Sequence, residues 1–327
     1  MHDLAIIIVS TNEARWLRPC LSSIFEHVGS IALDVVVADN ESTDGTSEVV
    51  ESFSGARAVR CANKGFAHAN NRGALTTDAR YILFLNPDTE VREGTFGELV
   101  EALDARPSVG LVGVKQVGPN GVLFPTMRRF PNALRAVGEA VGSERLPVRA
   151  NWLGERELRM ELYDEERPCD WTSGSFMLTR REALDSAGLM DERFFIYSEE
   201  PDLSLRMKRA GWETRHLPLM TILHHEGKAG ISDRMLAQEA FARMQYARKH
   251  FSRSHQGAYA AALALRYVAR IALAGPGPAA GAQRRAANRR ALRTLTGRQP
   301  PPFGAPPPLA LAPGAREAVA AGDPDEG

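Results

Sequence analysis

Two adjacent glutamates are the strongest candidates for acid–base chemistry in this sequence. Glu199 and Glu200 precede Pro201 and Asp202 in a segment that begins with aromatic residues. Carboxylates so close together repel one another, which raises the pKa of at least one of them and suits a general base. Proline and aspartate are ordinary residues of a first helical turn, so Pro201 and Asp202 need no further explanation. Glu199 and Glu200 do need one.

Asp88 and His224 could contribute to a metal site. Asp88 follows the apolar run Tyr81–Leu85, and His224 begins the segment His-His-Glu-Gly after another apolar run. Magnesium or manganese prefers oxygen ligands and also binds substrate phosphates, so that one protein carboxylate can suffice. A lone aspartate after a strand is more often a turn residue, however, and an isolated histidine pair is usually structural.

Two polar segments have residues suited to a nucleotide. The segment 39–46 (D-N-E-S-T-D-G-T) offers carboxylates that can accept hydrogen bonds from a pyrimidine N–H or a ribose hydroxyl. The segment 63–73 (N-K-G-F-A-H-A-N-N-R-G) combines small residues with the cations Lys64 and Arg72, which could approach phosphates. Each segment also fits a plain helix start, the first as a capped turn and the second with Gly65 as the turn.

The elements that carry these segments indicate an α/β fold. Leu4–Val9, Asp34–Ala38 and Tyr81–Leu85 are short apolar runs, each followed by polar residues, and helical stretches alternate with them. Such strands predict a central, mostly parallel sheet with helices on both faces, which binds ligands at the carboxyl ends of its strands. The polar segments that follow these three runs sit at those ends.

The second half of the sequence is less regular. The segment 125–168 allows no assignment of elements. We predict strands at Gly110–Val114 and Trp171–Thr179, helices at Arg181–Ala187 and Asp202–Ala210, and mostly helix from 231 to 273. The expected organisation is a catalytic domain over 1–230, a C-terminal helical extension over 231–274, and a Pro-, Gly- and Ala-rich, largely disordered tail over 275–327.

The composition narrows the class of protein. The chain has 327 residues with 44% hydrophobic content, enough for a large core, and 40 basic residues balance 40 acidic ones. This balance gives no indication of nucleic-acid binding, although it hides a basic C-terminal region. Cys20, Cys61 and Cys169 are far apart. The apolar run at Leu4 has no basic lead-in, long apolar stretch or small-residue cleavage site around it, which argues against secretion. We therefore expect a cytoplasmic protein.

The segment 258–274 is apolar but contains Arg266 and Arg270. Two arginines in so short a stretch argue against a spanning helix, which needs about 20 mainly apolar residues. The arginines that follow at 284–293 could meet anionic lipid and hold the protein at the inner face of the membrane. A helix packed on the catalytic domain explains the same stretch equally well.

Taken together and in this order, the segments resemble family 2 glycosyltransferases, and within them the bacterial rhamnosyltransferase-like group. The resemblance extends from Ala5 to about Gly227. It is carried by the motifs I-I-I-V-S-T-N-E, D-N-E-S-T-D-G-T, N-K-G-F-A-H-A-N-N-R-G, L-N-P-D and F-F-I-Y-S-E-E-P-D-L-S-L-R. It implies the GT-A fold and a divalent metal, Mg²⁺ or Mn²⁺, under the diphosphate of a nucleotide sugar.

The family's roles carry over at matching positions. The resemblance implies that the donor is bound by Thr11, Asn12, Glu13, Asp39, Asn40, Asp44, Asn63, Lys64, Gly65 and Asn86. It implies Asp88 and His224 at the metal. We expect Glu200 as the base with Glu199 beside it, and Trp171, Gly174 and Ser175 on the acceptor side, where the indole could give a sugar a flat face.

Two departures from the family pattern stand out. The usual Glu-Asp pair is Glu199-Glu200 here, which lengthens the expected base by one methylene. The Ser or Thr that commonly follows the H-x-x-G segment is replaced around Ala229.

The resemblance implies an inverting transfer in which a carboxylate takes the acceptor's proton while a metal stabilises the departing diphosphate. The expected donor is a dTDP- or UDP-sugar, with rhamnose the leading choice, and the expected acceptor is a lipid-linked or surface polysaccharide. One alternative is a nucleotidyltransferase, but Ser10–Glu13 is not the Gly-rich, basic loop which that class carries. Another is a catalytically silent protein that binds nucleotide sugars.

Overall fold

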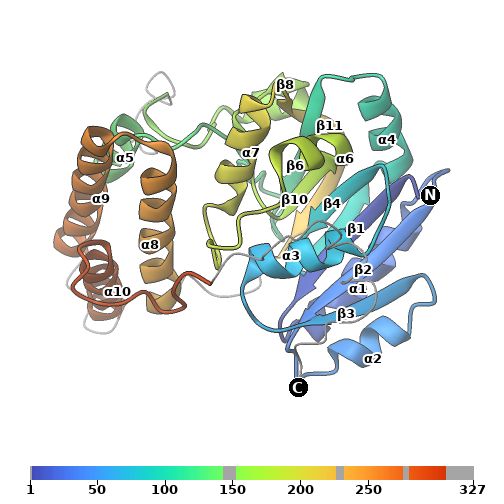
Figure 1. Cartoon of the computed structure of the whole chain (residues 1–327), viewed down its shortest axis with the longest axis horizontal. Helices are drawn as coiled ribbons and strands as arrows, with labels where there is room; N and C mark the ends of the chain where they lie inside the picture. Colours follow the sequence, from blue (N-terminus) through green and yellow to red (C-terminus); the bar gives the residue numbers. More distant parts are fainter. Residues whose placement is uncertain (1, 143–151, 226–231, 275–279, 307–327) are drawn as a thin grey trace.

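A mixed β-sheet forms the centre of the molecule, and a group of helices forms one end of it (Figure 1). The computed structural model describes residues 2–142, 152–225, 232–274 and 280–306. The strands, in chain order, are β1 (Leu4–Ser10), β2 (Leu33–Asn40), β3 (Ala56–Cys61), β4 (Tyr81–Leu85), β5 (Thr89–Glu93), β6 (Val109–Val117), β7 (Met127–Arg128), β8 (Arg167–Pro168), β9 (Trp171–Thr172), β10 (Phe176–Arg180) and β11 (Glu213–His224). The helices are α1 (Ala14–Glu26), α2 (Thr46–Glu51), α3 (Phe66–Leu75), α4 (Phe96–Asp104), α5 (Ala133–Ala140), α6 (Arg181–Ala187), α7 (Glu199–Arg209), α8 (Asp233–His250), α9 (Arg253–Leu273) and α10 (Ala280–Leu295).

The main sheet has the strand order β3-β2-β1-β4-β10-β6-β11-β5, with β8 paired to β11. The first four strands are parallel, β10 runs antiparallel to both of its neighbours, and β11 is parallel to β6 and antiparallel to β5. Helices α1, α2 and α4 pack on one face, whereas α3, α6 and α7 pack on the other. The predicted α/β fold with helices on both faces is confirmed, and every residue of β1 is buried accordingly.

The structure differs from the predicted elements in three places, two in the second half of the chain and one in the first. The strand expected at Trp171–Thr179 is two strands, because the chain turns at 173–175, where the N–H of Phe176 donates to the carbonyl of Ser173. Helix α7 begins at Glu199 and not at Asp202. Strand β3 was not predicted, because its alternating partly exposed side chains lack the apolar run of a central strand.

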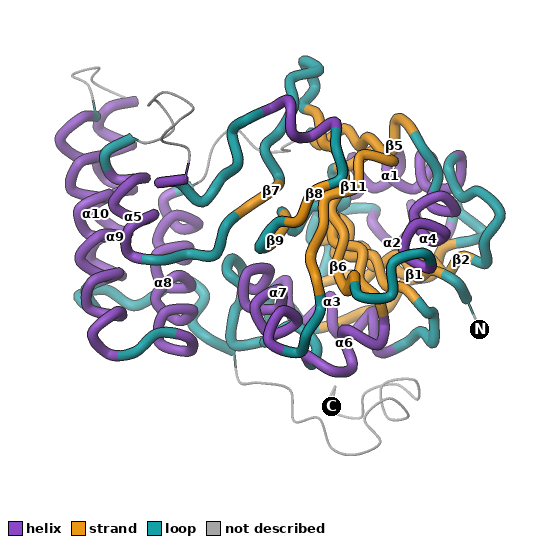
Figure 2. The backbone as a smooth tube through the Cα atoms, turned by 90° about the horizontal axis from the view of Figure 1, so that it is seen from above, coloured by secondary structure: helices purple, strands orange, loops and turns teal. Residues whose placement is uncertain are grey.

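The C-terminal helices α8, α9 and α10 pack against one another and against α5, at the end of the molecule away from β3 (Figures 1 and 2). The expected disordered tail is wrong over 280–295, which forms α10. Its buried apolar residues are small, Ala287 and Ala291, so close packing replaces the large apolar side chains that a sequence pattern detects. Residues 307–327, and Gly227 and Ala229 of the predicted diphosphate segment, lie outside the described residues.

Within the described residues, no helix combines the length and the apolar character that crossing a membrane requires.

Candidate active site

The predicted nucleotide-binding segments meet at the carboxyl ends of β1 and β2. The side-chain nitrogen of Asn40 donates to Thr11 Oγ1 at 3.3 Å and to Asn63 Oδ1 at 3.0 Å, which joins three separate motifs. The Asn40 side-chain oxygen is buried and has no hydrogen-bond partner among the described residues. A buried acceptor without a donor is costly, so this atom is suited to a ligand N–H or hydroxyl.

Two other predicted donor residues hold the loops of this edge together. The side-chain oxygen of Asn12 accepts from the N–H of Thr43 at 2.7 Å, and Asn12 itself lies in the left-handed region with φ 56°. Asp44 accepts from the N–H of Ala14, the first residue of α1, at 2.9 Å and from the Thr46 hydroxyl at 2.6 Å. Asn12 and Asp44 therefore fix the loops that carry Thr11 and Asp39.

Asp39 is buried, and one of its carboxylate oxygens accepts from the N–H of Ser42 at 2.9 Å. Asn63 and Lys64 are exposed at the same edge, as the sequence predicts for groups that meet a ligand. Gly65 has φ 106°, and a Cβ there would lie 2.3 Å from the carbonyl oxygen of Phe195. Only glycine fits this position, where the donor segment touches the loop that leads to Glu199.

The two predicted metal ligands lie side by side although they are far apart in the sequence. Nε2 of His224 is 3.3 Å from Oδ1 of Asp88, and both side chains are largely buried. The N–H of His225 donates to the Asp88 carbonyl at 2.9 Å, which holds the end of β11 against the turn after β4. Nδ1 of His224 is buried without a partner among the described residues. The edge of the imidazole that carries Nδ1 therefore makes no hydrogen bond within the described residues.

Asn86, at the same turn, acts through its backbone: its N–H donates to the carbonyl of Ser175 at 3.1 Å. The turn that carries Asp88 is thereby tied to the segment 173–175, which faces the glutamates. Among the described residues, no group of three or more His, Cys, Asp or Glu side chains could hold a metal by itself. A metal at Asp88 and His224 would need further ligands from a substrate.

The glutamate pair stands at the start of α7. Glu199 is 2% exposed, and its Oε2 has no partner among the described residues. Burial raises its pKa well above the ordinary value, and the neighbouring charge of Glu200 adds to this shift. Glu200 is partly exposed and lies against Gly174, where an added Cβ would be 2.6 Å from Glu200 Oε1. Glycine at 174 therefore leaves room for this carboxylate.

Burial also raises the pKa of Glu200, while hydrogen bonds from the backbone and the charge of Arg128 oppose the shift. Arg128 was not singled out from the sequence, because it lies in the segment that allowed no assignment of elements. Burial lowers its own pKa to about 10, so that it remains a cation at neutral pH. Its guanidinium lies 5.4 Å from the centre of the Trp171 ring.

Asp202 does not share the environment of the two glutamates. Its buried carboxylate pairs with Arg206 at 2.9 Å, Lys249 at 2.6 Å and His250 at 2.7 Å. Burial opposes its ionisation, but these hydrogen bonds and charges hold its pKa below the ordinary value. The crowding of negative charge at the start of α7 is therefore mainly between Glu199 and Glu200.

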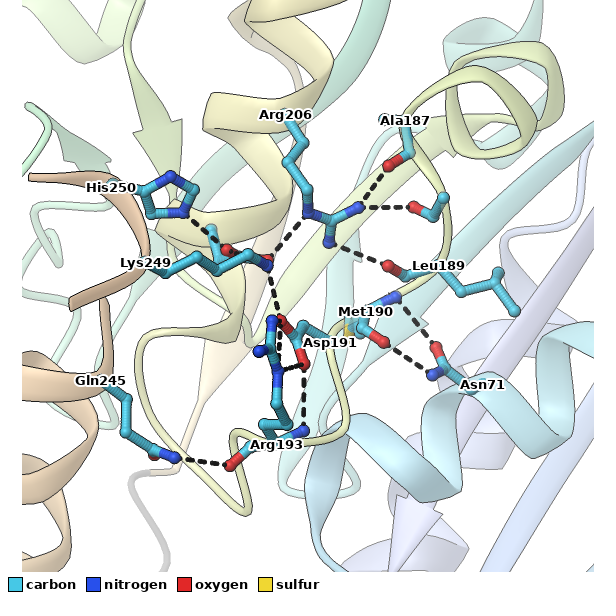
Figure 3. A network of polar contacts seen from close by, with 12 residues as sticks. Asn71, Ala187, Leu189, Met190, Asp191, Arg193, Arg206, Gln245, Lys249 and His250 are labelled. Carbon is cyan, nitrogen blue, oxygen red and sulfur yellow. Dashed lines mark hydrogen bonds and ion pairs between the residues drawn. The ribbon is translucent and has the colours of Figure 1, made fainter. Parts of the chain in front are cut away.

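A polar network fixes the loop 188–198, which leads into Glu199 (Figure 3). On the side of α8, Lys249 binds the Asp191 carboxylate at 2.6 Å, and Gln245 donates to the carbonyl of Arg193. On the side of α3, Asn71 hydrogen-bonds the backbone of Met190 in both directions. Arg206 of α7 donates to the carbonyls of Ala187, Gly188 and Leu189.

The same loop contains a buried pair that the sequence did not reveal. Glu192 accepts from His68 at 2.7 Å and from Asn71 at 2.8 Å. The loop ends with Tyr197 and Ser198, both in the left-handed region with φ 72°. The network supports this uncommon backbone immediately before the glutamates.

Of the three predicted acceptor-side residues, Gly174 lies against Glu200. The indole N–H of Trp171 donates to the carbonyl of Arg129 at 2.9 Å, and the ring is nearly buried. The Ser175 hydroxyl donates to Gln116 Oε1 at 2.8 Å. Trp171 and Ser175 thus have partners within the protein, and their contact with an acceptor stays a prediction.

Comparison with known proteins gives consistent matches. Residues 5–187 match the family described as glycosyl transferase family 2. The chain is 33% identical over 207 residues to the N-acetylglucosaminyl-diphospho-decaprenol L-rhamnosyltransferase of Mycobacterium tuberculosis. The aligned region covers 59% of this chain and 67% of that relative. Rhamnosyltransferase WbbL of Escherichia coli is 23% identical over 67% of this chain and 82% of its own length.

Among solved structures, the mannosyltransferase PcManGT from Pyrobaculum calidifontis, in complex with GDP-Man and Mn²⁺, is similar with a TM-score of 0.55. The two chains are 17% identical, and the match covers 91% of this chain and 88% of the other. At this identity the likeness is one of fold.

Proposed function

The chain belongs to glycosyl transferase family 2, and on that premise we propose that it transfers rhamnose from a dTDP- or UDP-linked donor to a lipid-linked or surface polysaccharide acceptor. That the protein is a glycosyltransferase follows from the family. The choice of rhamnose is supported by two relatives that carry this activity in their names. The observation that carries the mechanism is the meeting of the nucleotide segments, the Asp88–His224 pair and Glu200 at one edge of the sheet.

The nucleoside of the donor binds at the ends of β1 and β2. Its polar groups hydrogen-bond to Asp39 and to the unpaired side-chain oxygen of Asn40, and Thr11 and Glu13 line the same site. Lys64 is exposed at this edge and offers its charge to the diphosphate.

Asp88 and His224 fit a divalent cation, Mg²⁺ or Mn²⁺. Nε2 of His224 is 3.3 Å from Oδ1 of Asp88, so that an imidazole nitrogen and a hard carboxylate oxygen could bind the same cation. When bound there, such a cation would stabilise the charge that develops on the leaving diphosphate. Two protein ligands leave positions for the phosphate oxygens of the donor.

Glu200 removes the proton from the acceptor hydroxyl as that oxygen attacks the anomeric carbon from the side opposite the diphosphate. Direct displacement of this kind inverts the anomeric configuration. Glu199 is the more deeply buried member of the pair and has an unpaired oxygen, which favours its protonated form. A protonated Glu199 leaves the negative charge of the pair on Glu200, where the base is needed.

We place the reaction in the cytoplasm, at the inner face of the membrane, where a lipid-linked acceptor would be available. The three cysteines are free, and Cys20 and Cys61 are buried, which suits a reducing compartment.

The proposal is tested by incubating the purified full chain with a panel of dTDP-, UDP- and GDP-sugars and a short-chain prenyl diphospho-sugar acceptor. We expect a product heavier by one deoxyhexose, formed from dTDP- or UDP-rhamnose and dependent on Mg²⁺ or Mn²⁺. Transfer of another sugar would refute the assignment of rhamnose. Tight donor binding without any transfer would instead identify a protein that only binds nucleotide sugars.

A further inference from the structure

The outward face of α9 is apolar, whereas surface helices ordinarily turn polar residues outward. The side chains at Ala261, Leu265, Val268 and Ala272 are all exposed, with Leu265 at 47% and Val268 at 50%. Their spacing of four, three and four residues places them on one stripe of the helix. That stripe contains no charged residue.

One of the three arginines of α9 lies on the inner side of the helix, whereas Arg253 and Arg270 are exposed outside this stripe. Arg266 is buried and pairs with Glu139 of α5 at 3.0 Å and with Glu239 of α8 at 3.4 Å. Buried charges hold α9 to its neighbours while aliphatic side chains face outward, an inversion of the usual pattern. The helix is therefore built to meet an apolar environment on its outer face.

Helix α5 packs beside α9 and repeats this feature (Figure 2). Leu134 and Val137 of α5 are exposed, and so is Val141, the residue that follows the helix, which is 63% exposed. The three residues are spaced by three and four positions. Trp152, also exposed, lies next to the helix, because the neighbouring Leu153 carbonyl packs on Gly138. Exposed tryptophan beside aliphatic residues is typical of the boundary between water and lipid.

Helix α10 packs on α9 as well and adds positive charge. Arg289 and Arg293 are exposed and one helical turn apart, in line with the exposed Ala282 and Ala286. Residues 231–306 contain 13 Lys and Arg against 2 Asp and Glu, a formal charge of +11, whereas residues 1–230 contain 26 against 34, a charge of −8. The charge of the molecule is thus strongly divided between its two ends.

We propose that the exposed faces of α5 and α9 (Leu134, Val137, Val141, Leu265 and Val268) insert at the surface of a bilayer whose anionic headgroups are bound by Arg289 and Arg293. The apolar stripes supply the area buried among the acyl chains, and the arginines select anionic lipid. The proposal deepens the proposed function, since a lipid-linked acceptor would be met at that surface.

The test is sedimentation of the full chain with vesicles that contain 30% phosphatidylglycerol, compared with vesicles of phosphatidylcholine alone. We expect binding to the anionic vesicles that weakens as salt is added. The double variant L265E/V268E should lose at least tenfold in affinity, and R289Q/R293Q roughly fivefold for each arginine removed. V122E is the matched control, because Val122 is 62% exposed in a turn of the catalytic domain, and it should bind as the wild type does.

Equal vesicle binding by the wild type and L265E/V268E would overturn the proposal. A dimeric wild type that L265E/V268E converts to a monomer without changing vesicle binding would overturn it too, since the face would then join two copies. Sugar transfer to a water-soluble acceptor should be unchanged in L265E/V268E. The loss of vesicle binding can therefore be judged separately from the loss of transferase activity, which bears on the proposed function.

Discussion

The two ends of this molecule handle charge in opposite ways. At the carboxyl edge of the sheet, carboxylates such as Glu199 are buried and lack full compensation, which raises their pKa. At the helical end, buried charge is paired, as in Arg266 with Glu139 and Glu239, and the exposed stripes are aliphatic. Buried carboxylates without full compensation of their charge indicate a catalytic site. A paired buried charge beneath an exposed apolar surface indicates a surface that attaches to a partner, here a membrane.

The largest expected effect is at Glu200. Glu200→Gln preserves the shape of the side chain but cannot accept a proton, and losing a general base typically costs about 10²–10⁴-fold in rate. Donor binding should survive, because the nucleotide segments are unchanged. The measurement is the single-turnover rate of transfer together with donor affinity.

Glu199→Gln is the matched control for this variant. Burial favours the protonated form of Glu199, and a protonated carboxyl resembles an amide in shape and charge, so we expect this change to affect the rate much less. Near-normal transfer by Glu200→Gln with an inactive Glu199→Gln would move the base by one residue.

Asp88→Asn tests the proposed role of Asp88 as a metal ligand at the same edge of the sheet. It should weaken metal-dependent donor binding by at least the roughly 10–100-fold that loss of an outer-shell metal partner costs. Calorimetry with the nucleotide sugar, with and without Mn²⁺, measures the effect. Undiminished metal-dependent binding would remove Asp88 from the metal site.

Lys249→Met tests the contact between α8 and the segment around the glutamates, formed by the loop 188–198 and α7. Lys249 of α8 pairs with Asp191 and Asp202, and its loss leaves two buried carboxylates with fewer partners. We expect the free energy of unfolding to fall by about 2 kcal/mol, less than for a fully buried isolated pair because Arg193, Arg206 and His250 remain. Urea denaturation measures this change.

The exposed neighbour Arg248 supplies the control for that variant. Arg248→Met should stay within about 0.5 kcal/mol of the wild type. If both variants lose the same free energy of unfolding, the ion pairs of Lys249 do not account for the stability of this contact.

The smallest expected effect is a displacement of the pH profile. A base acts only when deprotonated, so activity is present above its pKa and falls as pH drops through it. Because burial raises the pKa of Glu200, the acid limb of kcat/KM should lie above the ordinary glutamate value of about 4.3. Arg128→Gln should move the limb further up, since the cation favours the charged carboxylate. A limb that moves down would contradict this assignment.

The sequence indicated which residues lie together better at strand ends than in places where the contact depends on packing. Asp88 and His224 were assigned from separate motifs, and the antiparallel pairing of β11 with β5 brings them together. The pair of His68 with Glu192 spans 124 positions, and no local pattern connects two such residues. Arg128 was missed for a similar reason, because its proximity to Glu200 depends on how an irregular segment packs.

Helical periodicity predicted how far the C-terminal helices extend but not which of their side chains face the protein interior. The helical region from 231 to 273 was predicted, and α8 and α9 fill most of it. Composition suggested that Arg266 and Arg270 interrupt an apolar face. The structure instead turns Arg266 inward, because Glu139 and Glu239 from neighbouring helices neutralise it. Such pairing depends on tertiary contacts, as does the burial of the alanines that order α10.

Direct displacement with Glu200 as base is tested most directly by the anomeric configuration of the product. NMR of the purified product gives this configuration from the one-bond carbon–proton coupling at the anomeric centre, with a donor of known configuration. We expect the anomeric configuration of the product to be opposite to that of the donor. A product with the donor's own configuration would contradict it, because retention requires an intermediate or a front-side path that Glu200 acting as a base does not provide.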